Sequence, residues 1–338
     1  MKKNNKKIFI TGVAGFIGFH LCYFLLKKNY TIYGIDNINN YYSTKIKLKR
    51  LDILKKFINF HYKKISINEE KLFLNFVKNS NSKIIIHLAA QPGVRYCYTN
   101  PKIYLKRNVE AFLNVLEVMR KLNLNKLIYA SSSSVYGDAI NFPTSENHKL
   151  NPINLYGGTK VFNEDMAKIY NINFSINSFG LRFFTAYGSL GRPDMMIAKS
   201  IKKIKKKKII DLYNKGNHSR DFTHVSTIVD IICGLINKIE KFKGINNFNI
   251  CSGKKIPVKK LLKNIGMKLG VKPKTINIAK QKGDMLETHG DNKKIKLFLK
   301  RKIRFTSLDE GLEETINPNY DYKKYVSKNT LYIQLYWL

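Results

Sequence analysis

The chain has few cysteines for its length. Four occur among 338 residues, Cys22, Cys97, Cys233 and Cys251, and they are scattered without the spacing of metal ligands or of a redox pair. This usage is typical of structural thiols in a reducing compartment and argues against a disulfide framework. We therefore expect a cytoplasmic protein and no metal site.

Acidic residues are also scarce. The 23 Asp and Glu are outnumbered by 61 Lys and Arg, which gives a net charge of +38. Such a charge is compatible with a non-catalytic nucleic-acid-binding protein. The excess is mostly lysine, however, and it is spread along the chain without a recognition motif, so we expect no nucleic-acid partner. The positive field would instead help to attract an anionic substrate.

Internal repeats and low-complexity linkers are absent, and the length allows one large domain or two modest ones. A long run without charged residues extends from Ile8 to Leu26 after several lysines, and its length is enough to span a membrane. The run nevertheless contains three glycines, Thr11 and His20, lacks a cleavage site, and leads directly into a predicted strand. We therefore expect no membrane association.

The most informative feature that is present is the run Gly12, Gly15 and Gly18 between an apolar segment and a helical pattern. Glycine permits a tight turn, close approach of a pyrophosphate to a helix N-terminus, and close packing of helix on strand. Asp36, at the end of the next predicted strand, can accept hydrogen bonds from an adenosine ribose and would repel the 2′-phosphate of NADP. Glycines also make ordinary turns, but this context favours an NAD site.

Strand-like segments alternate with helical patterns, which predicts an α/β fold with a doubly wound parallel sheet, the Rossmann arrangement. The predicted strands are Lys7–Thr11, Thr31–Asp36, Asn59–Lys64, Lys83–Leu88, Lys126–Ser131 and Ile176–Phe184. The predicted helices are Phe16–Lys28, Thr44–Lys56, Glu69–Asn79, Ile103–Leu122 and Leu155–Asn171. Because ligands gather at the carboxyl ends of such strands, the segments after Leu88 and Ala130 should face the site.

Beyond Thr185 the pattern becomes irregular. Loops are predicted at residues 188–194, 214–222 and 281–291, with a strand at 209–213 that follows a lysine-rich helix end. We expect a substrate-binding region here.

Tyr156 and Lys160 stand four residues apart at the start of a predicted helix, a spacing that places both on one face. An ammonium group there would lower the pKa of the phenol, as would an oxidised nicotinamide ring. Tyr156 could then take a proton from an alcohol as hydride leaves the same carbon. Such a pair is common by chance, so its meaning depends on the rest of the pattern.

Two other polar features lie at predicted strand ends. The serine run Ser131–Ser134 can supply a hydroxyl to a reacting oxygen, or it can merely cap the local backbone. His87 is interpreted as a core or loop histidine, because no second histidine or carboxylate shows metal spacing near it.

Together these segments resemble the extended short-chain dehydrogenase/reductase family of nucleotide-sugar enzymes. The residues that carry the resemblance are Thr11–Gly18, His87–Ala90, Ser131–Gly137 and Tyr156–Lys160. Five further segments are similar to motifs of UDP-glucuronate 4-epimerases, at residues 34–42, 91–96, 181–185, 191–195 and 220–223. The likeness extends from about Lys7 to Glu314.

The resemblance implies a nucleotide-sugar 4-epimerase that interconverts UDP-glucuronate and UDP-galacturonate through a 4-keto intermediate, with transient hydride transfer to bound NAD. The implied catalytic residues are Ser132, Tyr156 and Lys160. The implied NAD-binding residues are Gly12, Gly15, Phe16, Ile17, Gly18, Asp36, Asn37, Leu88, Ala89, Ala90, Asn108 and Lys160, of which Asn108 matches a structural asparagine. The implied substrate-binding residues are Gln91, Arg95, Ser133, Ser134, Thr185, Arg192, Arg220 and Asp284.

Within that last set, the resemblance implies that Ser133, Ser134, Thr185 and Arg192 hold the sugar carboxylate, and that Arg220 and Asp284 contact the diphosphate and the uridine ribose. It also implies an NAD-binding domain over residues 1–183 and a mostly UDP-sugar-binding region over residues 184–338, with some segments returning to the first domain. A homodimer formed through the helices at 103–122 and 155–171 is expected on the same basis.

Alternatives remain open. A UDP-glucose/UDP-galactose 4-epimerase would share Tyr156 and Lys160, and only Arg192 and Thr185 favour a carboxylated sugar. Related dehydratases and decarboxylases carry acidic residues where this chain has Ser133 and Ser134. A non-catalytic NAD-binding protein would be expected to lack the tyrosine or the lysine. The chain departs from the family at Ser66, in place of an adenine-binding Asp, and in the tail after about Glu314.

Overall fold

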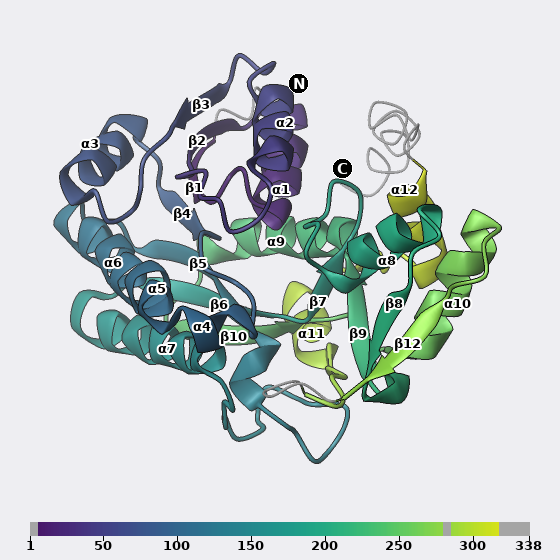
Figure 1. Cartoon of the computed structure of the whole chain (residues 1–338). Helices are drawn as coiled ribbons and strands as arrows, with labels where there is room; N and C mark the ends of the chain where they lie inside the picture. The colour runs from purple at the N-terminus through teal and green to yellow at the C-terminus, as the bar shows by residue number, and fades with distance from the viewer. Residues whose placement is uncertain (1–5, 280–284, 318–338) are drawn as a thin grey trace.

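The computed structural model describes residues 6–279 and 285–317. Its central feature is a seven-stranded sheet with the strand order β10-β6-β5-β4-β1-β2-β3, in which every pairing is parallel (Figure 1). The strands are β1 Lys7–Thr11, β2 Thr31–Ile35, β3 Phe60–Lys63, β4 Ile84–His87, β5 Lys126–Ser132, β6 Asn177–Phe183 and β10 Ile245–Ile250. The order reverses between β1 and β4, which is the topological switch point of a doubly wound sheet.

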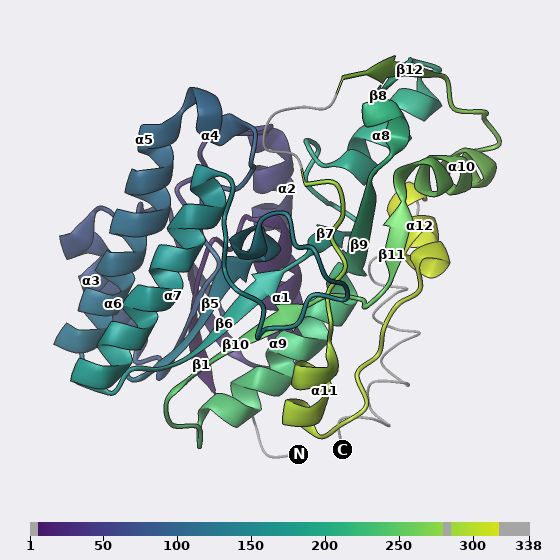
Figure 2. The ribbon, with the colours of Figure 1, turned by 90° about the horizontal axis from the view of Figure 1, so that it is seen from below.

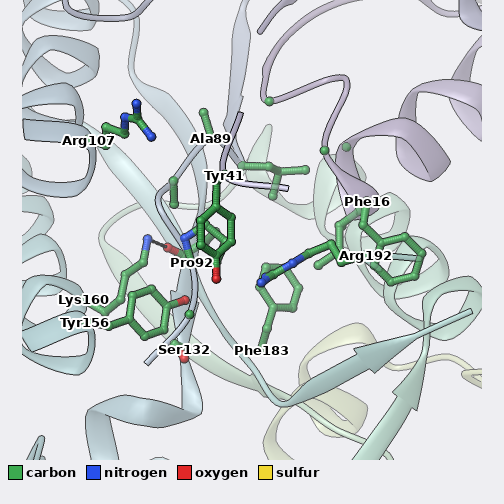
Figure 3. A pocket seen from close by; sticks show the side chains of 18 of the residues that line it. Phe16, Tyr41, Ala89, Pro92, Arg107, Ser132, Tyr156, Lys160, Phe183 and Arg192 are labelled. Carbon is green, nitrogen blue, oxygen red and sulfur yellow. Dashed lines mark hydrogen bonds between the residues drawn. The ribbon is translucent and has the colours of Figure 1, made fainter. Parts of the chain in front are cut away.

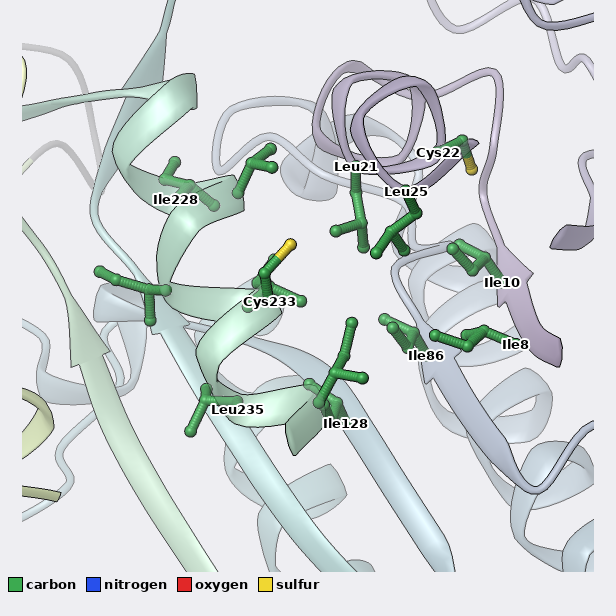
Figure 4. Packing of buried hydrophobic residues seen from close by; sticks show 14 of the residues in the cluster. Ile8, Ile10, Leu21, Cys22, Leu25, Ile86, Ile128, Ile228, Cys233 and Leu235 are labelled. Carbon is green, nitrogen blue, oxygen red and sulfur yellow. The ribbon is translucent and has the colours of Figure 1, made fainter. Parts of the chain in front are cut away.

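Both faces of this sheet are buried, which explains why its strands are almost continuously apolar. Along β1, Ile8 and Ile10 belong to the hydrophobic core on one face, whereas Phe9 belongs to the core on the other. The first face packs against helices α1 (Phe16–Lys27) and α9 (Val225–Ile239), and Figure 4 shows Leu21 and Leu25 of α1 on the side that faces Cys233 of α9. The second face packs against α3, α6 and α7 (Figure 2).

The helices of the first half follow the predicted alternation with strands, and the predicted fold class is confirmed. They are α1 Phe16–Lys27, α2 Thr44–Leu54, α3 Glu70–Ser80, α4 Tyr96–Thr99, α5 Pro101–Tyr104, η1 Leu105–Glu110, α6 Ala111–Lys121, η2 Ser133–Tyr136 and α7 Leu155–Phe174. The predicted single helix at 103–122 is wrong in one respect. Residues 105–110 form a π-helical turn between α5 and α6, and a 3.6-residue periodicity does not reveal such a turn.

The second half supplies smaller sheets beside the central one. Its elements are β7 Thr185–Tyr187, α8 Met196–Lys205, β8 Ile210–Tyr213, η3 Asn214–Gly216, β9 Ser219–His224, α9 Val225–Ile239, β11 Lys255–Pro257, α10 Val258–Leu269, β12 Thr275–Ile278, α11 Lys293–Leu299 and α12 Leu308–Ile316. Strands β11, β9 and β7 form one sheet, and β12 pairs with β8. The loop predicted at 214–222 is partly wrong, because residues 219–222 belong to β9.

Two elements from the second half of the chain belong to the central sheet and to the helices that cover it. Strand β10 pairs with β6 at the edge of the central sheet, and α9 packs on the same sheet face as α1. Within residues 6–279 and 285–317, no helix combines the length and apolar character that crossing a membrane requires. The uncharged run that begins at Ile8 is divided instead between β1 and the 12-residue α1.

The glycine turn after β1 depends on the absence of side chains. Gly12 has φ of +78°, and a Cβ at this position would lie 2.8 Å from the backbone nitrogen of Ala89, after β4. A Cβ at Gly18, inside α1, would overlap the carbonyl oxygen of Gly12. The helix therefore reaches the sheet closely only because position 18 is glycine.

We predict opposite effects of the same substitution at two helical glycines. Gly18→Ala should lower the free energy of unfolding by about 1–3 kcal/mol, because the added methyl group overlaps backbone. Gly158→Ala, in α7, should raise it by up to about 1 kcal/mol, because nothing lies within 4 Å of the new methyl group. Chemical denaturation of both variants measures this, and equal effects would contradict the packing argument.

Candidate active site

A pocket of about 590 Å³ opens at the carboxyl ends of the central strands. Five strands contribute to it: the segments after β1, β2 and β4 provide Gly12, Asp36 and Ala89, and the ends of β5 and β6 provide Ser132 and Phe183. This is the crevice where ligands bind in doubly wound sheets. The wall opposite comes from the segment 185–195 and from Arg220 of β9.

The N-terminus of α1 faces this pocket without a side-chain cap. Gly12, Gly15, Phe16, Ile17 and Gly18 all line the pocket, so backbone amides at a positive helix end are available to a pyrophosphate. Asp36 and Asn37 line the same end. The Asp36 carboxylate accepts hydrogen bonds from the amides of Ala14, at 3.1 Å, and Ile38, at 2.8 Å. These features fit an NAD molecule whose pyrophosphate lies on the helix.

The charge of the pocket is strongly one-sided. Among the described residues that line it, Asp36 is the one carboxylate. The lining cations are Lys47, Lys106, Arg107, Lys160, Arg192 and Arg220. The positive charge that is spread along the chain is therefore also concentrated at the site, where it suits ligands that carry phosphate and carboxylate groups.

The N-terminal cap of α7 places Tyr156 at the pocket. The side chain of Asn154 accepts a hydrogen bond from the amide of Gly157 at 2.9 Å, and Thr159 donates to the carbonyl of Tyr156 at 2.8 Å. Tyr156 and Lys160 both line the pocket, as expected from their spacing on the helix. In Figure 3, the phenol of Tyr156 lies close to Ser132 and points toward the centre of the pocket.

Ser132 is held so that its hydroxyl proton is available. Its oxygen accepts a hydrogen bond from the amide of Ser134 at 3.1 Å. The hydroxyl lies beside the phenol of Tyr156, and its capacity to donate a hydrogen bond to the phenolate lowers the pKa of that tyrosine. This arrangement can donate a hydrogen bond to an oxygen that gains negative charge.

Burial favours the neutral forms of both Tyr156 and Lys160, so it shifts their pKa values in opposite directions. It raises the pKa of Tyr156 above its usual value, against the hydrogen bond from Ser132 and the charge of Arg192. It lowers the pKa of Lys160 to about 8, against the charge of Glu164. The effect of Lys160 on the pKa of the phenol stays a prediction. In the structure the Lys160 Nζ donates at 2.8 Å to the carbonyl of Ala130, and the charge of Arg192 lowers the pKa of Tyr156.

Arg192 enters the pocket from the side opposite Tyr156, and Tyr41 lies between them in Figure 3. The guanidinium pairs with Asp194, with Nη2 and Oδ2 2.6 Å apart. Ser133, Ser134 and Thr185 line the same pocket. The four residues that the resemblance assigns to a sugar carboxylate thus line one pocket, and Arg192 is the cation among them.

Three of the predicted site residues do not line the pocket. Asn108 lies in the π-helical turn, where its side chain binds the backbone of Gln91, with amide N to Oδ1 at 2.7 Å, and Thr159. Gln91 is buried and accepts a hydrogen bond from Arg107. Arg95 is exposed and lies over the ring of Tyr213.

Asp284 and the tail after residue 317 lie outside the described residues. Leu88, Ala89, Ala90 and Arg220 do line the pocket.

The structure adds lining residues that sequence reasoning left without a role. Tyr41 and Tyr42 belong to segment 34–42, whose resemblance implies no role for them. Ser66, which stands in place of an adenine-binding Asp, also lines the pocket. Arg107 reaches the pocket from the π-helical turn. Apolar periodicity does not predict where an arginine side chain points from such a turn. The paired tyrosines after Asp36, by contrast, are a sequence pattern that could have indicated a role in the pocket.

His87 is buried, and its Nδ1 lies 2.9 Å from the hydroxyl of Thr11, so it links β4 to β1. Burial lowers its pKa to about 3, which keeps the ring neutral. Behind Ser132, the buried pair Arg182 and Glu164 has a 2.6 Å separation, and Glu164 also accepts from the hydroxyl of Ser131 at 2.6 Å. These contacts hold the ends of the central strands together under the site.

The sheet, the glycine turn and the Tyr156–Lys160 pair define a dinucleotide-dependent enzyme of the Rossmann class. Comparison with protein families places residues 8–251 in the NAD dependent epimerase/dehydratase family, and the chain belongs to that family. The predicted resemblance and the predicted NAD dependence are both confirmed.

Individual relatives agree over nearly the whole chain. An uncharacterised protein of Methanocaldococcus jannaschii is 40% identical over 315 residues, which are 92% of this chain and 95% of that protein. The UDP-glucuronate 4-epimerase of Thermodesulfobacterium geofontis is 34% identical, over 91% of this chain and 94% of the relative. The crystal structure of UDP-glucuronic acid 4-epimerase from Bacillus cereus, in complex with UDP-glucuronic acid and NAD, is similar with a TM-score of 0.85 and 29% identity. It covers 95% of this chain and 99% of that one.

We predict that Asp36 controls the choice between NAD and NADP. Asp36→Asn should narrow the preference for NAD by about tenfold, because the carboxylate that repels a 2′-phosphate is gone. Binding of both cofactors measured by calorimetry gives the ratio. Asp52→Asn removes a carboxylate at an exposed position of α2, outside the pocket, and should leave the ratio unchanged. An unchanged ratio in Asp36→Asn would contradict this assignment.

Proposed function

We propose that this nucleotide-sugar epimerase interconverts UDP-glucuronate and UDP-galacturonate. The observation that carries the proposal is the arrangement of Tyr156 and Arg192 on opposite sides of one cationic pocket, with Ser132, Ser133 and Thr185 around them. The first group suits proton transfer at a sugar hydroxyl, and the second suits a carboxylate on the same sugar. Relatives named as UDP-glucuronate 4-epimerases support the same substrate.

The cofactor would be held by the glycine turn and the N-terminus of α1 at its pyrophosphate and by Asp36 at its ribose, and Lys160 would contact its other ribose. When bound, NAD supplies the acceptor and then the donor of a hydride at C4 of the sugar. Tyr156 takes the proton from the C4 hydroxyl and later returns it, so it acts first as base and then as acid. Ser132, whose oxygen is already engaged by the amide of Ser134, donates a hydrogen bond to the sugar oxygen.

Arg192 has a second task in this scheme. A keto group at C4 makes the C6 carboxylate part of a β-keto acid, which can lose carbon dioxide. Hydrogen bonds from the planar guanidinium to the carboxylate restrain its rotation. The C5–C6 bond, which breaks in decarboxylation, is thereby kept from aligning with the π system of the C4 carbonyl. The absence of acidic side chains at Ser133 and Ser134 removes the general acid that an elimination would need.

The test is direct. Purified protein is incubated with UDP-glucuronate and, separately, with UDP-glucose, and inversion at C4 and release of carbon dioxide are followed. We expect inversion of UDP-glucuronate without carbon dioxide release, and Tyr156→Phe should lower kcat by about 10²- to 10⁴-fold. Tyr170→Phe is the matched control, because its hydroxyl binds Glu117 between α6 and α7. Preferred turnover of UDP-glucose would favour the UDP-galactose type of epimerase, and an active Tyr156→Phe would refute the mechanism.

We further propose that the protein is a homodimer that pairs through α6 and α7. These neighbouring helices lie at the outer side of the molecule in Figure 2, and both expose large apolar side chains. Phe162, Ile169 and Ile172 are 50%, 53% and 71% exposed and recur along α7 at a helical spacing. Leu113 of α6 is 39% exposed. A second copy of the same face would cover this stripe and form a four-helix arrangement.

We predict that the double variant Phe162→Glu and Ile169→Glu is monomeric, because paired interfaces would bury carboxylates against apolar surface. The mass in solution, measured by light scattering at micromolar concentration, distinguishes the states. Ile58→Glu changes a residue that is 98% exposed after α2 and should leave the dimer intact. A monomeric wild-type protein, or a double variant that still pairs, would refute this interface.

A further inference from the structure

Arg192 is committed on one edge of its guanidinium. Its Nε donates to Oδ1 of Asp194 at 3.1 Å, and its Nη2 donates to Oδ2 at 2.6 Å. This bidentate pairing leaves Nη1, and the second proton of Nη2, to interact with a ligand. Asp194 therefore decides which edge of the cation a ligand can use.

The pair is fixed by a third side chain. The hydroxyl of Tyr41 donates to Oδ2 of Asp194 at 3.3 Å, and the guanidinium carbon lies 5.7 Å from the centre of the Tyr41 ring. Tyr41 follows β2, whereas Asp194 follows β7, so the contact joins the two walls of the pocket. The side chains of Arg192 and Asp194 are only 17% and 27% exposed, which limits screening of the pair by water.

Asp194 also offsets the charge that Arg192 presents to the pocket. Burial alone would raise the pKa of Asp194, but the hydrogen bonds and charge of the guanidinium lower it by more, so the pKa lies below its usual value. The carboxyl group is therefore ionised at neutral pH. A sugar carboxylate that binds the free edge of Arg192 is attracted by the guanidinium and repelled by Asp194. Arg192 is also the cation whose charge lowers the pKa of Tyr156.

We propose that Asp194 is a specificity-determining residue that orients Arg192 and moderates its hold on the sugar carboxylate. The proposal rests on the proposed function for the identity of that carboxylate. A moderated hold on the carboxylate has a chemical purpose, because the 4-keto sugar must rotate within the site before hydride can return to its other face. A carboxylate bound to an uncompensated arginine would resist that rotation, whereas a freely rotating arginine would not protect the carboxylate from loss.

The test compares equilibrium binding of UDP-glucuronate and UDP-glucose to the NAD-loaded wild-type protein and to Asp194→Asn. We expect the variant to bind UDP-glucuronate about tenfold more tightly relative to UDP-glucose, because the repelling charge is removed. Its kcat for UDP-glucuronate should fall, so that kcat and KM decrease together. The acid limb of its pH–rate profile should move to lower pH, because the less compensated Arg192 favours the phenolate of Tyr156.

Three further variants make the result specific. Asp194→Glu keeps the charge and should keep the wild-type binding ratio. Asp194→Ala also removes the charge, but it leaves a smaller side chain than Asp194→Asn does. It should shift the binding ratio in the same direction as Asp194→Asn. Asp211→Asn removes an equal charge from a surface pair with Lys203, whose atoms lie 2.9 Å apart, and should change neither ratio nor pH profile.

An unchanged binding ratio in both Asp194→Asn and Asp194→Ala would overturn the proposal, as would equal weakening of both ligands. Inversion at C4 by the wild-type protein together with an unchanged ratio would leave the proposed function intact and refute the role of Asp194. A shifted ratio in a protein that inverts neither sugar would support the role of Asp194 while refuting the proposed function.

Discussion

The guanidinium of Arg50 is the contact on which the pocket depends. Arg50 belongs to α2 and is fully buried. It donates to the carbonyl of Ala14 at 2.8 Å, to the carbonyl of Leu190 at 2.6 and 3.1 Å, and to the hydroxyl of Tyr42 at 2.9 Å. Ala14 lies inside the glycine turn, and Leu190 precedes Arg192 by two residues. One side chain thus ties the turn that receives a pyrophosphate to the segment that carries the second wall. A lysine could not provide this planar set of donors.

Around that anchor, the site combines deep burial with an excess of cations. Burial opposes the ionised forms of both Tyr156 and Lys160, which by itself would leave a phenol that is a poor base at neutral pH. The surrounding lysines and arginines favour anions in the same space. The chemistry therefore depends on charges that arrive with the ligands as well as on those of the protein, because a pyridinium ring beside Tyr156 would add to the charge of Arg192 that already acts on it.

Much of this could be predicted from the sequence. Apolar runs such as Ile8-Phe9-Ile10 identify buried parallel strands, and the glycine turn, Asp36, and the four-residue spacing of Tyr156 and Lys160 follow local rules that hold in any such fold. The π-helical turn at 105–110 could not be predicted, because the segments on either side are too short for a shift of one residue in the apolar pattern to be recognised. The Tyr41–Asp194 and Arg50–Leu190 contacts were also out of reach, since they join segments about 140 residues or more apart in sequence.

The return of β10 to the central sheet has a consequence for how the chain is made. Residues 184–244 are inserted between two strands that are neighbours in the sheet, β6 and β10. A ribosome must therefore release Ile250 before the sheet is complete, by which time the wall that carries Arg192 has already been synthesised. Until then the outer backbone edge of β6 has no partner strand, and such an edge is a template for pairing between chains. The enzyme therefore cannot be divided at residue 184 into two pieces of which the first retains the intact seven-stranded sheet.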